Sequence, residues 1–188
     1  NIEGFLNETD VLIIDIPPGL RRVILSSEEM TFVNKVKTLI PFIEKSDVQK
    51  VIFVSSTSVY GDGFPIVEIT EETQPNPDTE NGKQLVIAET LLQSNSHFKT
   101  TVIRFGGLLS DDRHPVKFLA GRTNVENPDA PVNMIQREDC IGIIEKSLDF
   151  ARDDNWEWNQ TFNAVAPQHP TRKAYYHKKA EILNLPLP

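Results

Sequence analysis

The alternation of short apolar runs with amphipathic segments is the feature that most constrains the fold of this chain. Residues 10–16 and 50–56 are nearly continuous aliphatic runs, and Pro17-Pro18-Gly19 stops the first. Such runs are typical of strands buried on both faces of a parallel sheet. Between them, apolar residues from Phe32 to Ile43 recur at the spacing of one helical face. Strand, helix and strand in this order predict a βαβ unit, and therefore an α/β fold.

The alternation continues along the rest of the chain. Ser26 and Glu29 form a capping-box pattern at the start of the first helical segment. Residues 57–81 form a long loop with three prolines and an acidic cluster. The further predicted elements are a helix over 82–92, a strand over 100–105, a short strand over 132–135, a helix with Asp139 as its N-cap, a strand over 160–165 and a helix over 171–183.

Composition excludes several classes of protein. The 188 residues have a formal net charge of −8, which argues against broad contact with nucleic acid. Cys140 is the single cysteine, so no intramolecular disulfide can form and a reducing compartment is expected. No apolar run approaches the roughly 20 residues that a membrane span requires, and no signal peptide is visible. The four histidines form no metal-binding pattern. We therefore expect a cytoplasmic protein without a metal site, a membrane contact or a nucleic-acid partner.

The segment Phe53-Val54-Ser55-Ser56-Thr57-Ser58-Val59-Tyr60-Gly61 is the most specific motif. It resembles the strand-to-loop segment of the extended short-chain dehydrogenase/reductases, a group that includes nucleotide-sugar epimerases and dehydratases. Residues 71–77, 102–109 and 132–139 resemble further segments of that family in the same order, with Gln136 where a histidine is usual. The resemblance spans most of residues 10–165. It implies a Rossmann-type, doubly wound parallel sheet with a small C-terminal substrate-side region.

The resemblance also implies the site. A hydroxyl at the carboxyl end of a buried parallel strand projects into the crevice where open α/β sheets bind ligands. Matched by position, the catalytic residue is Ser56, the cofactor-binding residues are Pro17, Pro18, Ser55, Gly106 and Gly107, and the substrate-binding residues are Thr57, Asn133 and Arg137. The implied cofactor is NAD or NADP, the partner is a small-molecule substrate, and a homodimer is the candidate assembly.

Two departures from the family pattern bear on function. The family's Tyr and Lys, which transfer the proton and hold the ribose, fall on Asn81 and Leu85. Asn81 cannot ionise, so any proton must come from another group, with Tyr60, Lys83 or a bound water as candidates. The nine glycines contain no Gly-x-x-Gly-x-x-Gly or Gly-x-Gly-x-x-Gly pattern. By resemblance, Val11 begins the family's fourth strand. The sheet is therefore expected to lack its first strands, which correspond to about 60 to 70 residues upstream of Asn1. The C-terminus is also expected to be truncated.

Each candidate residue has a second, purely structural interpretation. Ser56 is also suited to cap the turn after its strand, and Pro17-Pro18 to terminate one. Tyr60 is also suited to packing, and Asn133 to a hydrogen-bonded loop. Arg104 at a strand end is expected to pair with a carboxylate, with ligand binding as the alternative.

These observations define two functional hypotheses and a division of the chain. Residues 1–110 are expected to form the C-terminal part of an NAD(P)-binding Rossmann-like domain. Residues 111–188 are expected to contain the small substrate-binding region and the remaining sheet elements. The first hypothesis is an NAD(P)-binding epimerase/dehydratase-like oxidoreductase of unknown substrate, which a nucleotide sugar would fit, with its Tyr/Lys pair absent. The second is a non-catalytic NAD(P)-binding sensor or scaffold protein. Whether the protein is an enzyme stays open, because function depends on the site and not on the fold.

Overall fold

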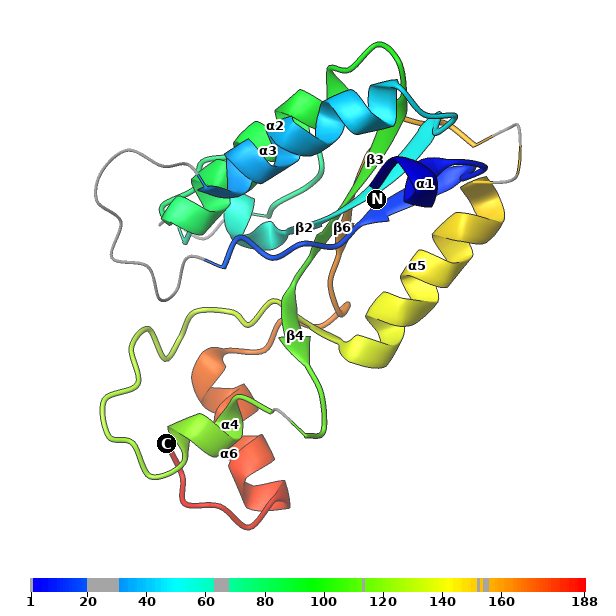
Figure 1. Cartoon of the computed structure of the whole chain (residues 1–188). Coiled ribbons are helices and arrows are strands. Elements are labelled where there is room, and N and C mark those ends of the chain that lie inside the picture. The colour runs from blue at the N-terminus through cyan, green and yellow to red at the C-terminus, as the bar shows by residue number, and fades with distance from the viewer. Residues whose placement is uncertain (1, 20–30, 63–67, 113, 152, 154–155) are drawn as a thin grey trace.

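Four parallel strands form the centre of the larger of two lobes (Figure 1). The computed structural model describes residues 2–19, 31–62, 68–112, 114–151, 153 and 156–188. The sheet has the order β1-β2-β3-β6, with bounds β1 Val11–Ile14, β2 Lys50–Ser56, β3 Lys99–Phe105 and β6 Thr161–Ala164. The parallel pairing predicted for the first three strands is confirmed.

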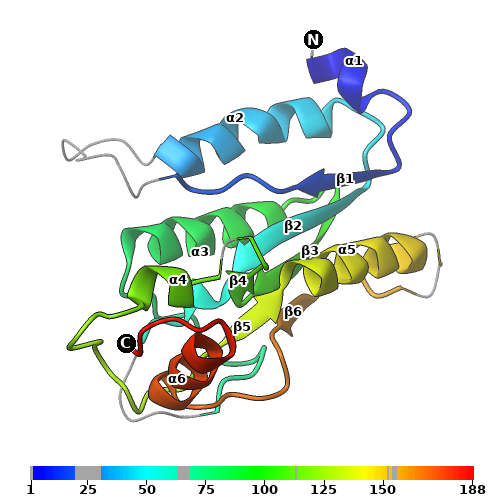
Figure 2. The ribbon, with the colours of Figure 1, turned by 90° about the horizontal axis from the view of Figure 1, so that it is seen from below.

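Helices cover both faces of the sheet (Figures 1 and 2). α2 (Thr31–Glu44) and α3 (Glu80–Gln93) lie on one face, and α5 (Arg137–Ala151) lies on the other. The short α1 (Ile2–Leu6) contacts α2. This two-sided cover is the doubly wound arrangement expected from the strand and helix alternation.

The side chains of β2 explain why both faces need cover. Val51 and Phe53 pack in the core on the α2 and α3 side, whereas Ile52 packs in a separate core on the α5 side. Successive residues of a strand point to opposite faces, so a continuous apolar run is buried only between two helical layers. The same alternation directs Ser55 toward α3 and Ser56 toward the opposite face.

A smaller lobe is built mainly from residues between β3 and β5 and after β6. It contains a two-stranded parallel sheet of β4 (Gly107–Leu109) and β5 (Met134–Gln136), with α4 (Val116–Leu119) and α6 (Arg172–Ile182). Its own apolar cluster joins Val116, Val132, Tyr176 and Ala180. Within the 111–188 segment, β6 and α5 belong to the larger lobe.

Some local predictions differ from the structure. Asp139 is not the N-cap of α5, because that helix begins at Arg137 directly after β5 and Asp139 lies in its first turn. The strand expected over 132–135 is β5, displaced toward Gln136, and a short strand that was not predicted, β4, begins at Gly107. The capping box of Ser26 and Glu29 lies outside the described residues.

No helix in the described part of the chain has both the length and the apolar character that a membrane crossing requires.

Candidate functional site

A cavity of about 710 Å³ lies between the carboxyl edge of β2 and the smaller lobe. Ser56 and Thr57 line it from the end of β2 and the 3₁₀ turn η2 (Thr57–Val59). Gly107 of β4 and Asn133 before β5 line it from the other lobe. The structure therefore brings together four of the residues singled out in the sequence, and it places them where open α/β sheets bind ligands.

Ser56 has a hydroxyl proton available for a ligand. Its backbone is extended, with φ −142° and ψ 146°, and its Oγ accepts a hydrogen bond of 3.2 Å from the Ser58 backbone N–H. This confirms the expectation that Ser56 caps the following turn. In the part of the chain that the structure describes, no acceptor is recorded for the Ser56 O–H group. Because a hydroxyl both accepts and donates, the cap leaves its donor function unused.

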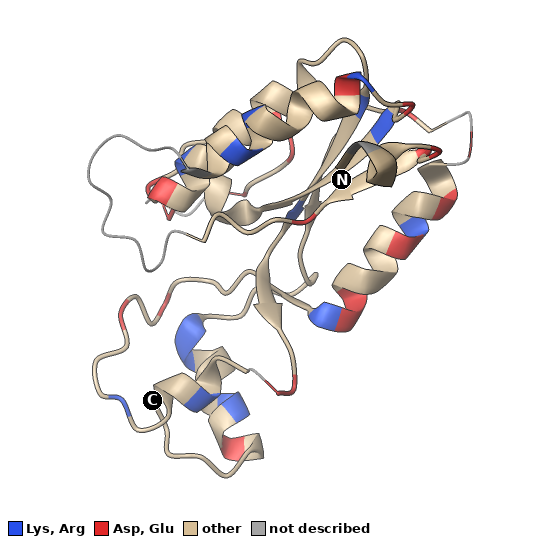
Figure 3. Ribbon diagram, in the orientation of Figure 1, with Lys and Arg blue, Asp and Glu red and all other residues tan. Residues whose placement is uncertain are grey.

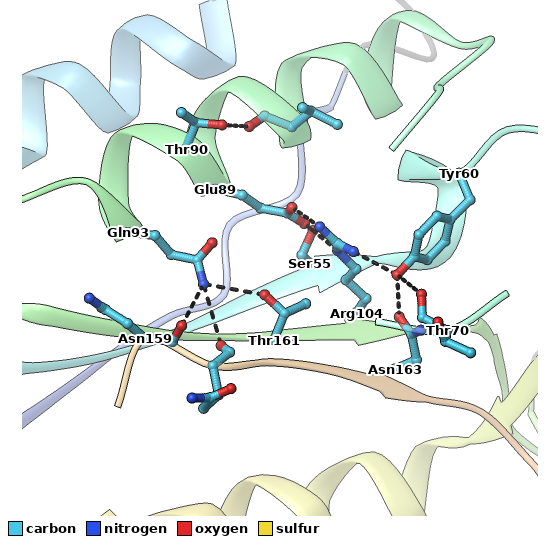
Figure 4. Close-up of polar contacts among 12 residues, drawn as sticks. Ser55, Tyr60, Thr70, Glu89, Thr90, Gln93, Arg104, Asn159, Thr161 and Asn163 are labelled. Carbon is cyan, nitrogen blue, oxygen red and sulfur yellow. Dashed lines mark hydrogen bonds and ion pairs between the residues drawn. The ribbon is translucent and has the colours of Figure 1, made fainter. Parts of the chain in front are cut away.

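Arg104 links this cavity to the protein interior (Figure 4). Its guanidinium forms two hydrogen bonds with the Glu89 carboxylate, Nε to Oε1 at 3.1 Å and Nη2 to Oε2 at 2.6 Å. Its Nη1 donates to the Tyr60 hydroxyl at 2.6 Å, and Tyr60 lines the cavity. The expected pairing of Arg104 with a carboxylate is confirmed, and the pair extends to a residue of the site.

The Glu89–Arg104 pair is buried and well satisfied. The two side chains are 4% and 7% exposed, and Ser55 Oγ donates to Glu89 Oε1 at 2.5 Å. Burial alone would lower the pKa of Arg104, but hydrogen bonds and charge from Glu89, together with Tyr60, raise it above its ordinary value. Arg104 is therefore a fixed cation. Ser55, assigned to the cofactor by resemblance, directs its hydroxyl to this pair on the α3 face of the sheet.

Tyr60 has all of its hydrogen-bonding groups engaged. Besides accepting from Arg104, its hydroxyl lies 3.0 Å from Asn163 Oδ1 and 3.2 Å from the Thr70 carbonyl oxygen. The Arg104 guanidinium carbon also lies 5.0 Å from the centre of the tyrosine ring. Tyr60 therefore joins β3, β6 and the loop after β2 at the wall of the cavity.

Two glycines let the chain turn closely around this wall. Gly61 has φ +73°, and a Cβ there would lie 2.5 Å from the Asn76 carbonyl oxygen. A Cβ at Gly82, in the first turn of α3, would lie 2.5 Å from the Ser58 carbonyl oxygen. Side chains at these positions would push apart the turn after Ser56 and the helix that begins at Glu80.

The two positions that the resemblance assigns to the family's Tyr and Lys lie on α3 in different surroundings. Asn81 is half-buried, and its Oδ1 is buried without a hydrogen-bond partner among the described residues. Leu85 is 4% exposed and packs in the core on the α2 and α3 side. A lysine at this position would lose its hydration, at a large cost in free energy. Neither residue is among those that line the cavity.

The remaining sequence candidates lie outside the cavity. Gly106 packs so tightly that a Cβ there would lie 3.0 Å from the Asn133 carbonyl oxygen, which gives this glycine a packing role. Pro17 and Pro18 follow β1, and Pro17 is exposed. Arg137 is about half exposed and pairs with Asp112 and Glu138 at the start of α5. Lys83 is exposed on α3.

Sequence reasoning missed the small-lobe side of the cavity. His169 and Arg172 line it there, together with Tyr176 of α6. His169 Nδ1 lies 3.3 Å from the Val132 carbonyl oxygen. These residues belong to no motif, and only the docking of α6 against β5 and its preceding loop brings them to the cavity. The one sequence signal for this side of the cavity was Arg172, a cationic residue at the start of the helix that follows β6.

Other reactive groups do not contribute to a metal or thiol site. The described residues contain no cluster of three or more His, Cys, Asp or Glu side chains that would hold a metal ion. Cys140 is buried on α5, where burial and then the Asp139 charge raise the pKa of its thiol to about 11. A thiol in this state is a poor nucleophile.

Solved structures of proteins in complex with NAD have the same fold as this chain. UDP-glucuronic acid 4-epimerase from Bacillus cereus, in complex with NAD, matches with a TM-score of 0.79 and 15% identity, over 98% of this chain and 62% of that chain. MoeE5 in complex with UDP-glucuronic acid and NAD matches with a TM-score of 0.78 and 16% identity, over 100% of this chain and 67% of that chain. The chain therefore has the Rossmann-type fold of NAD-dependent epimerase/dehydratase proteins, which confirms the predicted fold class.

One curated relative is more similar in sequence. Protein YeeZ of Escherichia coli strain K12 is 32% identical over 183 residues, which cover 97% of this chain and 62% of YeeZ. The chain thus spans less than two thirds of the length of this relative. No protein-family model matches the chain.

Proposed function

We propose that this chain forms the substrate side of an NAD(P)-dependent epimerase/dehydratase-like oxidoreductase that acts on a nucleotide sugar or a similar alcohol or carbonyl compound. The observation that carries the proposal is the Ser56 hydroxyl, which lies at the carboxyl end of β2, lines the cavity and has no recorded acceptor in the described chain. The fold shared with NAD complexes of UDP-sugar enzymes supports the same conclusion.

In this proposal Ser56 donates its proton in a hydrogen bond to the substrate oxygen at the reacting carbon. Such a donor stabilises the negative charge that develops on the oxygen during reaction. Thr57 and Asn133, on opposite walls of the cavity, bind and orient the substrate. Each supplies both donors and acceptors, as recognition of a polyhydroxylated substrate requires.

The proton-transfer group is proposed to be Tyr60. Of the two side-chain candidates named from the sequence, Tyr60 lines the cavity and Lys83 is not among its lining residues. The Arg104 hydrogen bond of 2.6 Å holds the Tyr60 hydroxyl in place. Its proton is shared with Asn163 and Thr70, so a substrate oxygen must replace one of these acceptors.

The cofactor fits the residues of this chain only in part. NAD or NADP would supply the group that accepts and returns a hydride. Holding its phosphates requires a glycine-rich loop at a helix start, and none of the nine glycines forms that pattern. The chain's own residues therefore account for substrate contacts and not for dinucleotide phosphates.

A non-catalytic NAD(P)-binding sensor or scaffold is the second candidate function. One observation favours it: Asn81 cannot ionise and Leu85 is buried in the core. If the resemblance assigns these positions correctly, neither side chain can make the family's proton-transfer or ribose contact there. Under this alternative, the protein binds NAD or NADP but does not catalyse a reaction.

The test uses the intact protein, meaning residues 1–188 together with the upstream strands that the family resemblance implies, with NAD or NADP and UDP-glucose or UDP-glucuronic acid. Product is followed by NMR, and reduced cofactor by absorbance. We expect Ser56→Ala to lower kcat/KM by about 100-fold, because one donor to a developing oxyanion contributes about that much. Ser96→Ala, the same change at an exposed position in the α3–β3 loop, should leave kcat/KM unchanged.

Two other outcomes separate the candidates. Cofactor binding without turnover, unaffected by Ser56→Ala, would establish the sensor or scaffold function. Failure of the intact protein to bind either cofactor would contradict both functions.

A further inference from the structure

His169 lines the Ser56 cavity from the smaller lobe, and two hydrogen bonds hold it in place. Its Nδ1 lies 3.3 Å from the Val132 carbonyl oxygen. The Val132 backbone N–H in turn donates to the Pro170 carbonyl oxygen at 3.0 Å. The imidazole is therefore tied to the segment that precedes β5, both through its own side chain and through the neighbouring backbone.

The contact with Val132 assigns the ring proton of His169. A carbonyl oxygen accepts hydrogen bonds and cannot donate them, so Nδ1 carries the proton in this contact. In the neutral ring the other nitrogen then holds a free lone pair, because the bond made by one ring nitrogen fixes the state of the other. No partner is recorded for Nε2 in the part of the chain that the structure describes. His169 therefore offers a ligand a nitrogen that is able to accept a proton.

Among the described residues, the other three histidines do not line the Ser56 cavity. His114 engages both of its ring nitrogens within the protein. His177 lines a second cavity, of about 560 Å³, and its Nε2 lies 3.1 Å from the Pro188 carbonyl oxygen. His97 is exposed in the loop between α3 and β3. His169 is thus the histidine that a ligand of the Ser56 cavity would meet.

The ionisable neighbours of His169 on the small-lobe wall keep their protons. Arg172 and Tyr176 line both cavities, so the two spaces meet at these residues. A guanidinium stays charged at physiological pH, and blue segments in Figure 3 mark further cations along α6. Burial raises the pKa of Tyr176, against a smaller opposite effect of the Arg172 charge, so the phenol is not a base. On this wall, therefore, the proton acceptor is His169.

The other side of the cavity has a different chemical character. Asp62, Glu68 and Asp78 line it from the loop after β2, and all three are exposed. An exposed carboxylate is a weaker base than an imidazole. Ser56 lines the same cavity at the end of β2, with a hydroxyl proton for which no acceptor is recorded in the described chain. The cavity thus combines a base on the small-lobe wall with a hydrogen-bond donor at the end of the sheet.

This arrangement suits the removal of a proton from carbon. In the proposed function, Ser56 and Tyr60 contact the reacting oxygen of the substrate from the β2 side. A base on the small-lobe wall therefore meets a different atom of the same ligand. When the reacting oxygen belongs to a carbonyl group, the C–H groups next to that carbonyl are the ones that can lose a proton, because the charge moves to the oxygen, where a hydrogen-bond donor stabilises it.

We propose that His169 is a catalytic base that removes a proton from the carbon next to the carbonyl group of a ketone substrate. The inference rests on the proposed function for the placement of the carbonyl at Ser56, and it adds an activity that needs no hydride transfer. The C–H bond breaks, its electron pair forms a C=C bond, and the carbonyl π electrons move to the oxygen. The proton goes to Nε2 of His169. Its return to the same carbon restores the ketone, so no oxidant or reductant is consumed.

Deuterium exchange into a ketone tests the proposal. The intact protein is incubated in deuterium oxide with NAD and UDP-4-keto-6-deoxyglucose, and proton NMR follows the signals of the carbons next to the carbonyl. His169→Asn keeps an N–H group for the Val132 carbonyl but lacks the Nε2 lone pair. We expect it to slow the exchange by at least about 100-fold, because a positioned general base contributes about that much. His97→Asn, the same change at an exposed histidine, should leave the exchange rate unchanged.

Two further measurements separate a base from a structural anchor. In His169→Ala, added imidazole should restore part of the exchange rate, because free imidazole supplies the missing lone pair and does not repair a displaced loop. Nitrogen-15 NMR of the unchanged protein should show the neutral His169 ring with its proton on Nδ1. Absence of imidazole rescue, with full activity in His169→Asn, would assign His169 to an anchoring role and overturn the inference.

The remaining outcomes distinguish this inference from the proposed function. An equal exchange rate in the unchanged protein and in His169→Asn, or a ring proton on Nε2, overturns the role of His169 and leaves the proposed function standing. No exchange in the unchanged protein also overturns the inference, while turnover with NAD still decides the proposed function. Exchange that depends on His169, without any NAD-dependent turnover, supports the inference and contradicts an oxidoreductase.

Discussion

Arg104 shows how one buried side chain connects the core to the candidate site. Two ionised groups inside a protein lose hydration, and their attraction offsets this loss only when the remaining hydrogen bonds are satisfied. Here Glu89 accepts from Arg104 and Ser55, and the remaining side of Arg104 faces Tyr60. The position of Tyr60 at the cavity therefore depends on a charge pair in the interior.

Removal of the Glu89 charge tests this dependence. Glu89→Gln leaves Arg104 buried without its counter-charge, and we expect the free energy of unfolding to fall by about 3 kcal/mol. Urea unfolding measures the loss, with Glu145→Gln on the exposed side of α5 as the control. Glu89→Leu combined with Arg104→Met should recover much of the stability, because no unpaired charge remains. An unchanged urea midpoint for Glu89→Gln would show that the pair is not coupled to folding.

At the level of single residues, the sequence predicts the type of partner better than its identity. Arg104 is expected to pair with a carboxylate, and it does. Ser56 is expected at the carboxyl end of a buried strand, and the structure places it there. The contact between Tyr60 and Asn163, however, joins residues 103 positions apart in the chain. No local pattern encodes such a contact, because it arises only when β6 joins β3.

Among the helices and strands, the bounds of those with a pronounced apolar pattern are predicted best. β2 has the predicted bounds, and its four consecutive apolar residues from Val51 to Val54 are the kind of run that a strand buried on both faces requires. The error at Asp139 has a physical cause. β5 passes directly into α5, so the acidic residues of the first turn stabilise the helix start without capping it. Tertiary packing brings His169 and Arg172 to the cavity, and no periodicity in the sequence predicts their location there.

His114 couples the packing of α4 and α6 to pH. It is 7% exposed, its Nδ1 accepts from the Val116 backbone N–H, and its Nε2 lies 3.0 Å from the Tyr175 hydroxyl. Burial and then the charges of Lys179 and Lys117 lower the pKa of His114, against a smaller opposite effect of Asp111. The neutral ring is therefore favoured in the folded state.

The sign of the pH effect follows from this shift. Because the folded pKa is below the unfolded value of about 6.5, the unfolded chain binds the proton first as the pH falls. We expect stability from His114 to be fully present above about pH 7 and to decrease as the pH falls through 6.5 toward the folded pKa. NMR titration of the His114 ring should give a pKa below 6.5, and His114→Asn should reduce the loss of stability between pH 7.5 and 5.5. A titration midpoint above 6.5 would contradict the assignment.

For the whole molecule, the sequence predicts the architecture but not the junction of the lobes. The strand and helix order gives the doubly wound sheet, because few connections satisfy a parallel α/β arrangement. The union of two cavities at Arg172 and Tyr176 depends on how α6 docks, which no motif specifies. The division at residue 110 remains a prediction.

The distribution of glycines leads to a prediction about cofactor binding by the 188-residue chain on its own. Without a glycine-rich phosphate loop it should not bind NAD or NADP. Isothermal titration with each cofactor should show no micromolar binding under conditions in which the Bacillus cereus UDP-glucuronic acid 4-epimerase serves as the positive control for NAD. Micromolar affinity for either dinucleotide would mean that the described residues hold the phosphates in a way that the glycine pattern does not reveal.

The place of β6 in the sheet has a consequence for the order of folding. Val102 of β3 pairs with Thr161 of β6, and residues 106–160 lie between these two strands. Closing so long a segment costs chain entropy before any contact of β6 forms, and pairings of high sequence separation slow the search for the native state. β1, β2 and β3 are linked by shorter crossovers, so they can associate first. The Tyr60–Asn163 contact then forms with the last strand, which makes the wall of the cavity a late product of folding.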